Sequence, residues 1–120
     1  MKVIIAGSRI FNDYQFMSIM CDNILGVRDD IEIVSGGAKG ADKLGERFAK
    51  ERNLPLTIFH AEWDKYGKSA GYKRNVQMAD YGDMLIAFWD GKSSGTKHMI
   101  NLAEKKGMEV NVFNPFEIDY

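Results

Sequence analysis

The alternation of short apolar runs with helix-like segments restricts the fold of this sequence more than any other feature. The apolar runs are long enough for buried strands, and the stretches between them carry apolar residues at helical spacing. The expected strands are Lys2–Ala6, Ile31–Val34, Leu56–Phe59, Met84–Phe88 and Val110–Phe113. Four helices are expected. The first runs from about Asn12 to Leu25, and the second carries Leu44, Phe48 and Ala49 and ends before Pro55. The third runs from about Tyr72 to Tyr81, and the fourth from Thr96 to Lys106. This alternation is typical of α/β proteins with a parallel sheet.

The chain has 120 residues, of which 45% are hydrophobic, so it can bury one core but is too short for a convincing second. We therefore predict a single Rossmann-like, doubly wound domain over residues 1–120, with about five strands in the order 3-2-1-4-5 and helices on both faces. Ligands of such folds bind at the carboxyl ends of the strands where the winding reverses. Here that point lies between the first and fourth strands.

Two glycine-rich turns, Ser35–Asp42 and Asp90–Thr96, each follow an apolar run and open a helix-like segment. Glycine lets the backbone approach a ligand closely, and the first amides of a helix attract anions. The turns therefore predict a site for a phosphorylated ligand. Neither turn has the spacing of a dinucleotide fingerprint or of a P-loop, so ATP hydrolysis is not expected.

The candidate ligand-binding residues come from these turns, from the turn after the first strand and from the segments beside them. They are Gly7, Ser8, Arg9, Ser35, Gly36, Gly37, Lys39, Gly40, Asp42, Trp63, Arg74, Asn75, Trp89, Asp90, Gly95 and Thr96. Arg9 and Lys39 can pair with phosphate oxygens, or they can be ordinary surface charges. Of the whole set, we expect the phosphate-facing floor to comprise Gly7, Ser8, Arg9, Gly36, Gly37, Gly95 and Thr96.

Several of these residues have a structural alternative. The stretch His60–Gly71 has neither helical nor strand periodicity, and we expect an irregular functional loop there. Arg74 and Asn75 can contact a ribose, base or phosphate, or can tie down that loop. Asp42 can cap its helix or bind a ribose hydroxyl.

The aromatic side chains near the turns also have alternative roles, and the two histidines are the candidate metal ligands. Trp63, Tyr66 and Trp89 can stack on a base, although Trp63 can also anchor its loop and Trp89 can contact another subunit. His60 and His98 have no partner at metal-ligand spacing, so no metal and no cofactor are predicted.

The charge and cysteine content exclude other classes. The 16 basic and 17 acidic residues give a net charge of −1, without the positive field of nonspecific nucleic-acid binders. The single cysteine, Cys21, cannot form an internal disulfide and is expected to be a small core residue.

No apolar stretch approaches the roughly 20 residues that span a bilayer, and Met1 leads directly into a strand-like run. We expect a cytoplasmic protein with no membrane partner.

The motifs Ile5–Arg9, Val34–Asp42 and Ala61–Gly71, followed by Arg74-Asn75 and Gly95-Thr96, together resemble the YspA/cpYpsA-related branch of the SLOG superfamily. This superfamily includes the lonely-guy phosphoribohydrolases and DprA-like domains. The resemblance implies a Rossmann-like fold and a nucleotide or nucleotide-derived ligand, which in some members is an NAD-derived signal such as an ADP-ribose-like molecule. It also implies a homodimer or higher homo-oligomer, and small members of this branch are often carried by phages.

Lonely-guy enzymes carry the pattern Pro-Gly-Gly-x-Gly-Thr-x-x-Glu, in which the glutamate belongs to the hydrolytic site. Met99 occupies the position of that glutamate here, and Trp89 that of the proline. Because methionine cannot orient water or stabilise a cationic sugar, we expect a sensor or sequestering protein and not an enzyme. The alternatives are a phosphoribohydrolase that uses Asp42, Asp64 or Asp90, and a binder of single-stranded nucleic acid, which the near-neutral charge disfavours.

Overall fold

The computed structural model, which describes residues 1–26 and 28–116, is built on a parallel sheet with the strand order β3-β2-β1-β4-β5. The strands are β1 (Lys2–Gly7), β2 (Glu32–Ser35), β3 (Leu56–Ile58), β4 (Met84–Phe88) and β5 (Glu109–Phe113). The winding reverses between β1 and β4, which pair in parallel from Val3 and Met84 to Gly7 and Phe88. The predicted α/β class and strand order are therefore confirmed.

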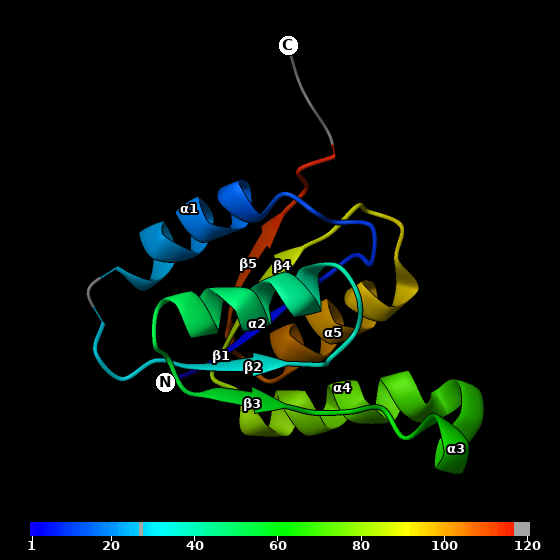
Figure 1. Ribbon diagram of the computed structural model, residues 1–120. Coiled ribbons are helices and arrows are strands. Elements are labelled where there is room, and N and C mark those ends of the chain that lie inside the picture. The colour runs from blue at the N-terminus through cyan, green and yellow to red at the C-terminus, as the bar shows by residue number, and fades with distance from the viewer. Residues whose placement is uncertain (27, 117–120) are drawn as a thin grey trace.

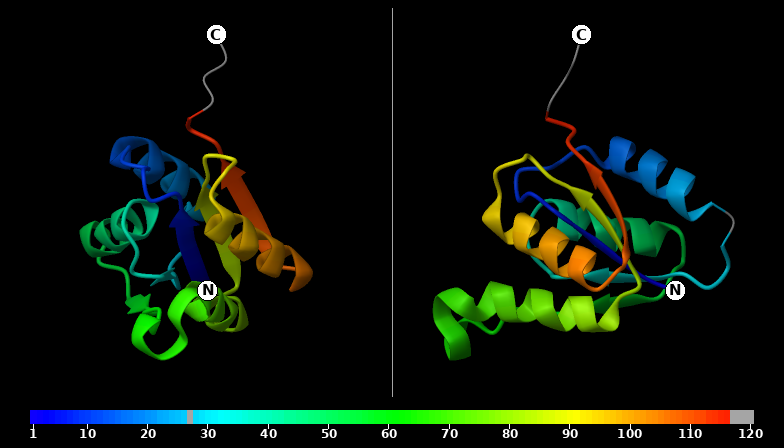
Figure 2. Two further views of the ribbon diagram at one scale, coloured as in Figure 1. Left: turned by 90° about the vertical axis from the view of Figure 1, so that its right-hand side faces the viewer. Right: turned by 180° about the vertical axis from the view of Figure 1, so that it is seen from behind.

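Helices cover both faces of the sheet, as Figures 1 and 2 show. They are α1 (Tyr14–Leu25), α2 (Ala41–Glu51), the short α3 (Trp63–Tyr66), α4 (Ala70–Tyr81) and α5 (Ser94–Lys105). The alternating side chains of β1 divide between the two layers. Val3 and Ile5 pack in the core shared with α1 and α2, whereas Ile4 and Ala6 pack in the core shared with α4 and α5.

The first helix forms where its sequence signals predict. The carboxylate of Asp13 caps α1 by accepting a hydrogen bond from the Phe16 amide at 3.0 Å. The helix then buries Met17, Cys21 and Leu25, which lie four residues apart on one face. Burial raises the pKa of the Cys21 thiol to about 12, so this cysteine is a core residue and not a nucleophile.

The prediction of an irregular loop over His60–Gly71 is wrong in part. This stretch contains α3, a 3₁₀ turn at Gly67–Ser69 and the first residues of α4. The sequence carried no helical period because α3 and the 3₁₀ turn bury none of their residues. A helix without a buried face leaves no apolar pattern to detect.

One glycine sets how closely α2 lies against the sheet. A Cβ atom added at Gly45 would stand 2.9 Å from both Cβ and Cγ2 of Ile5, a fully buried β1 residue. Real Cβ atoms do not approach other atoms this closely, so any side chain at position 45 must push the helix away from the strand.

We expect Gly45→Ala to lower the free energy of unfolding by about 1–3 kcal/mol, the usual cost of overpacking a core. This expected net loss already includes the gain of about 1 kcal/mol from the higher helix propensity of alanine. Urea denaturation measures the effect. Gly95→Ala is the matched control, since a Cβ at Gly95 meets nothing within 4 Å. Equal stability of the wild type and Gly45→Ala would contradict the close approach.

Candidate functional site

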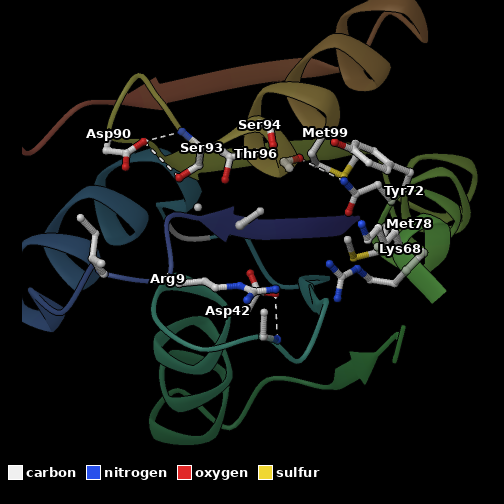
Figure 3. A pocket seen from close by; sticks show the side chains of 18 of the residues that line it. Arg9, Asp42, Lys68, Tyr72, Met78, Asp90, Ser93, Ser94, Thr96 and Met99 are labelled. Carbon is white, nitrogen blue, oxygen red and sulfur yellow. Dashed lines mark hydrogen bonds between the residues drawn. The ribbon is translucent and has the colours of Figure 1, made fainter. Parts of the chain in front are cut away.

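A cavity of about 410 Å³ lies at the carboxyl edge of the sheet, beside the point where the winding reverses. Its volume falls within the range of about 300–1,000 Å³ that is typical of small-molecule sites. In Figure 3, Ser93, Ser94 and Thr96 lie along one wall, whereas Arg9 and Asp42 lie along the opposite wall. The second glycine turn and the turn after β1 thus face each other as the strand order predicts.

The structure places the predicted residues in two groups. Those that line the cavity are Gly7, Arg9, Asp42, Trp63, Arg74, Asn75, Asp90, Gly95 and Thr96. Those that lie outside its lining are Ser8, Ser35, Gly36, Gly37, Lys39, Gly40 and Trp89. The lining also includes residues that the candidate set omitted, among them Ile10, Ala38, Lys68, Tyr72, Met78, Ser93, Ser94 and Met99.

The first glycine turn is held by its own hydrogen bonds. The buried hydroxyl of Ser35 donates to Glu46 at 2.8 Å and accepts from the amide of Gly37 at 3.1 Å. Gly40 has a φ of +76°, and a Cβ there would stand 2.4 Å from the Ser8 carbonyl oxygen. Lys39 is exposed. The glycines of this turn therefore serve its close packing and lie outside the cavity.

A closed ring of hydrogen bonds holds the second glycine turn against the turn after β1. The amide of Asp90 donates to the Ser8 hydroxyl at 3.0 Å, and the Ser93 hydroxyl donates to the Asp90 carboxylate at 3.1 Å. Because Ser93 has only one hydroxyl proton, the 3.1 Å contact between the two serines must be donated by Ser8. Ser8 is almost fully buried, so it positions the turn instead of facing the cavity.

The carboxylate of Asp90 is committed to this turn. It also accepts the amides of Lys92 and Ser93, each at 2.8 Å. These bonds lower the pKa of Asp90 to about 2, so it remains ionised and does not exchange protons near neutral pH. Trp89 is tied to the same turn, since its indole nitrogen donates to the Ser93 carbonyl at 3.0 Å.

The start of α5 is open toward the cavity. The Ser93 hydroxyl is used in the ring and makes no capping bond to α5, and the first turn of the helix carries no acidic residue. A side chain at Gly95 would meet no other group within 4 Å. Within residues 1–26 and 28–116, the amides of Ser94, Gly95 and Thr96 have no protein acceptor. These amides and the helix dipole form a suitable place for an anion.

The start of α2 differs from that of α5, because its first turn carries the acidic Asp42 and its first amide, that of Ala41, donates to the Ser8 carbonyl at 3.3 Å. Gly40 is its N-cap residue, so the expectation that Asp42 caps this helix is wrong. Asp42 is the second helical residue, and its Oδ2 accepts the amide of Ala38 at 3.1 Å. A carboxylate of the protein itself thus lies in the first turn of α2, where its negative charge opposes binding of a ligand anion.

Asp42 is 6% exposed and its environment opposes ionisation. Burial raises the pKa of Asp42 to about 6, and the nearby charge of Glu46 acts in the same direction. The Ala38 hydrogen bond and the charges of Arg74 and Arg9 partly counteract this rise. The cavity therefore contains a carboxyl group that titrates close to neutral pH.

Arg74 comes from α4 and crosses toward the first glycine turn. Its Nη1 donates to the Gly36 carbonyl at 2.6 Å, while its Nε is buried without a partner among the described residues. Burial lowers the pKa of Arg74, and the charge of Asp42 partly restores it. Arg9 and Lys68 add exposed positive charges to the cavity lining. In the described part of the chain, none of these three side chains forms a salt bridge.

Asn75 joins α4 to the start of α5. Its amide nitrogen donates to the Gly95 carbonyl at 3.1 Å and lies 3.1 Å from Nδ1 of His98. Asn75 therefore ties down the start of α5, and no hydrogen bond of its side chain reaches His60–Gly71 within the described residues. Its amide holds the open helix start in place.

The remaining lining is apolar. Met78 and Met99 are nearly fully buried, whereas Trp63 and Tyr72 are about half exposed. Met78 and Met99 also pack in the core cluster between the sheet and the helices α4 and α5. Sequence periodicity cannot show that a core side chain also borders a cavity. Tyr72 was missed because no motif or spacing marked it, whereas Lys68 lies within the motif Ala61–Gly71 but nothing in its spacing distinguishes it from a surface lysine.

Two further observations limit the kinds of site present. Among residues 1–26 and 28–116, no three His, Cys, Asp or Glu side chains gather as metal ligands would. No helix of the same residues is long and apolar enough to cross a membrane.

Asp42→Asn should stabilise the protein at neutral and alkaline pH. The folded pKa of about 6 exceeds the ordinary value of 3.8, so the native state binds the proton more tightly than the unfolded chain. The stability that Asp42 contributes is therefore full below about pH 4 and is lost as the pH rises through 6. Asparagine avoids the buried charge and still accepts from Ala38.

We expect this variant to gain about 1–3 kcal/mol near pH 8 and to match the wild type near pH 4, measured by urea unfolding across this range. Asp64→Asn, which alters an exposed carboxylate on α3, should show no such trend. A variant less stable than the wild type near pH 8 would mean that ion pairing with Arg9 and Arg74 outweighs the cost of burial.

Known proteins share both the sequence and the fold. Residues 1–66 match the YspA, cpYpsA-related SLOG family. The Gene 61 protein of Mycobacterium phage D29 is 34% identical, with 91% of this chain and 93% of that protein covered. The X-ray structure of DNA processing protein A (DprA) from Streptococcus pneumoniae is 20% identical, with a TM-score of 0.74 over 92% of this chain and 49% of that one. The chain spans about half of the DprA structure, and this likeness concerns the fold alone. With more than half of its residues matched and a relative aligned over nearly its whole length, the chain belongs to the YspA, cpYpsA-related SLOG family.

Proposed function

We propose that this protein binds a nucleotide or nucleotide-derived ligand, with a phosphate group at the start of α5. The observation that carries the proposal is the uncapped start of this helix on the wall of a 410 Å³ cavity at the switch point of the sheet. Membership of the SLOG family supports a nucleotide-type ligand.

The rest of the cavity suits the other parts of such a ligand. The half-exposed rings of Trp63 and Tyr72 offer surfaces on which a base can stack, and Met78 and Met99 offer an apolar surface beside them. Arg9, Lys68 and Arg74 offset the negative charge of a phosphate. A site with a small number of placed polar groups and a largely apolar lining is typical of small-molecule binding.

We infer a role in sensing or sequestering the ligand, because the buried side chain of Met99 borders the cavity where lonely-guy enzymes have glutamate. Hydrolysis of the N-glycosidic bond is the second candidate. It is favoured by the carboxyl group of Asp42, whose pKa near 6 suits proton exchange. Asp90 is a poor alternative because its carboxylate already accepts the amides and hydroxyl of its own turn.

We further propose that the protein is encoded by a phage, acts in the cytoplasm and forms a homo-oligomer. The similarity to a mycobacteriophage protein supports the viral origin. Sedimentation of the purified protein with and without a nucleotide measures its assembly.

Native mass spectrometry of the purified protein, followed by denaturation, tests the proposal directly. We expect a retained intact nucleotide, or binding from a panel of nucleoside monophosphates and ADP-ribose. Steady release of free base from a nucleoside monophosphate would show that the protein hydrolyses its ligand, and the proposed role in sensing or sequestering would give way to that of an enzyme. Absence of both binding and cleavage across the panel would overturn the proposal. Affinity that falls steeply as salt rises, seen only with single-stranded DNA or RNA, would favour a nucleic-acid ligand.

Gly95→Ala should weaken binding of a nucleoside monophosphate while preserving the fold. The added methyl group stands in open space over the start of α5, where it blocks approach of a phosphate to the helix amides. Loss of such charge-assisted bonds corresponds to about 10- to 100-fold in affinity. Isothermal titration measures the change.

Asn101→Ala is the matched control, because this exposed residue lies further along α5 and outside the cavity lining. It tests whether a change of helix propensity alone affects the affinity. Unaltered affinity of Gly95→Ala would show that the phosphate does not bind at this helix start.

A further inference from the structure

The starts of α2 and α5 are held on either side of one residue at the end of β1. The Ser8 carbonyl accepts the amide of Ala41, the first residue of α2, at 3.3 Å. The Ser8 hydroxyl contacts that of Ser93, the N-cap residue of α5, at 3.1 Å. A ligand with one group at the start of α5 therefore has its neighbouring groups close to the start of α2, where Asp42 lies.

The two carboxylate oxygens of Asp42 have different roles. Oδ2 accepts the Ala38 amide, whereas Oδ1 has no hydrogen-bond donor among residues 1–26 and 28–116. Oδ1 is also not among the fully enclosed atoms that lack a partner, so it retains contact with the cavity. Asp42 as a whole is only 6% exposed, and a carboxylate oxygen of such a buried residue that still faces a cavity is expected to meet a donor there.

We propose that Asp42 accepts hydrogen bonds from the 2′- and 3′-hydroxyl groups of a ribose and thereby makes the site selective for ribonucleotides over 2′-deoxyribonucleotides. The proposal rests on the proposed function, since it requires a nucleotide whose phosphate lies at the start of α5. It names the sugar of the ligand and the residue that recognises it.

A ribose diol fits this position better than the other parts of a nucleotide. An ionised carboxylate accepts hydrogen bonds but cannot donate them, so it repels a phosphate and attracts hydroxyl groups. The ribose is also the part of a nucleotide that is bonded to the 5′-phosphate. The aromatic side chains that suit a base, Trp63 and Tyr72, come from α3 and α4, not from α2.

The surrounding charges keep the carboxylate available. Arg74 on α4 and Arg9 after β1 favour its ionised form, and Glu46 on α2 opposes it. Neither arginine forms a salt bridge with Asp42 among the described residues, so neither occupies its free oxygen. A site that must accept a particular hydroxyl discriminates strongly against an analogue without it.

The test compares the affinities of the four common ribonucleoside 5′-monophosphates with those of their 2′-deoxy counterparts by isothermal titration. We expect the wild type to prefer the ribonucleotide by about 10- to 100-fold, the range of a hydrogen bond to a charged group. In Asp42→Asn, one amide oxygen remains for Ala38 and the amino group presents donors to the cavity. This variant should lose the preference and bind the two sugars almost equally.

Glu51→Gln is the matched control. It changes another α2 carboxylate to its amide at an exposed position outside the cavity lining, and it should leave the ribose preference unchanged. Equal affinity of the wild type for both sugars, or a preference that persists in Asp42→Asn, would overturn the role of Asp42 while leaving nucleotide binding intact. A change in base preference alone in Asp42→Asn would assign the carboxylate to an amino group of the base. Failure of all eight nucleotides to bind would overturn the proposed function together with this inference.

Discussion

The buried Ser8 connects the parts of the chain on which the cavity depends. Its amide donates to Phe88 at the end of β4, its carbonyl accepts from the first residue of α2, and its hydroxyl completes the ring with Asp90 and Ser93. Each polar group of this one residue thus fixes a different element. Because the walls of the cavity come from those elements, their separation is set by bonds that exist without a ligand. A site of this kind needs little rearrangement to bind.

Charge is distributed unequally between the two walls of the cavity. The first turn of α5 carries no acidic residue, whereas the first turn of α2 carries Asp42, whose burial opposes its ionisation. Burial makes this acid unfavourable even though two arginines partly offset the cost, and a neutral amide could make the same bond to Ala38. Groups of this kind are common where a protein gives up stability for function.

The fold was predictable because the strands and most helices each carry a local pattern, and because parallel crossovers have one handedness. The candidate site was predictable only where backbone position decides it, as at Gly95 and Arg9, which follow a strand end or open a helix. The first glycine turn misled the prediction, since a glycine needed for close packing, as Gly40 is against Ser8, looks the same in the sequence as a glycine needed for a ligand. Met78 was missed because a buried methionine has the same pattern whether or not it borders a cavity.

The segment that carries Trp63 makes no contribution to the core, since α3 buries none of its residues. The wall at the start of α5, by contrast, is fixed by Ser8, Asn75 and the buried face of α5. Substitutions in α3 can therefore accumulate without unfolding the protein, whereas substitutions in the opposite wall cannot. The two sides of the cavity are therefore under separate structural constraints, so the shape and chemistry of the α3 side can change while the start of α5 keeps its geometry.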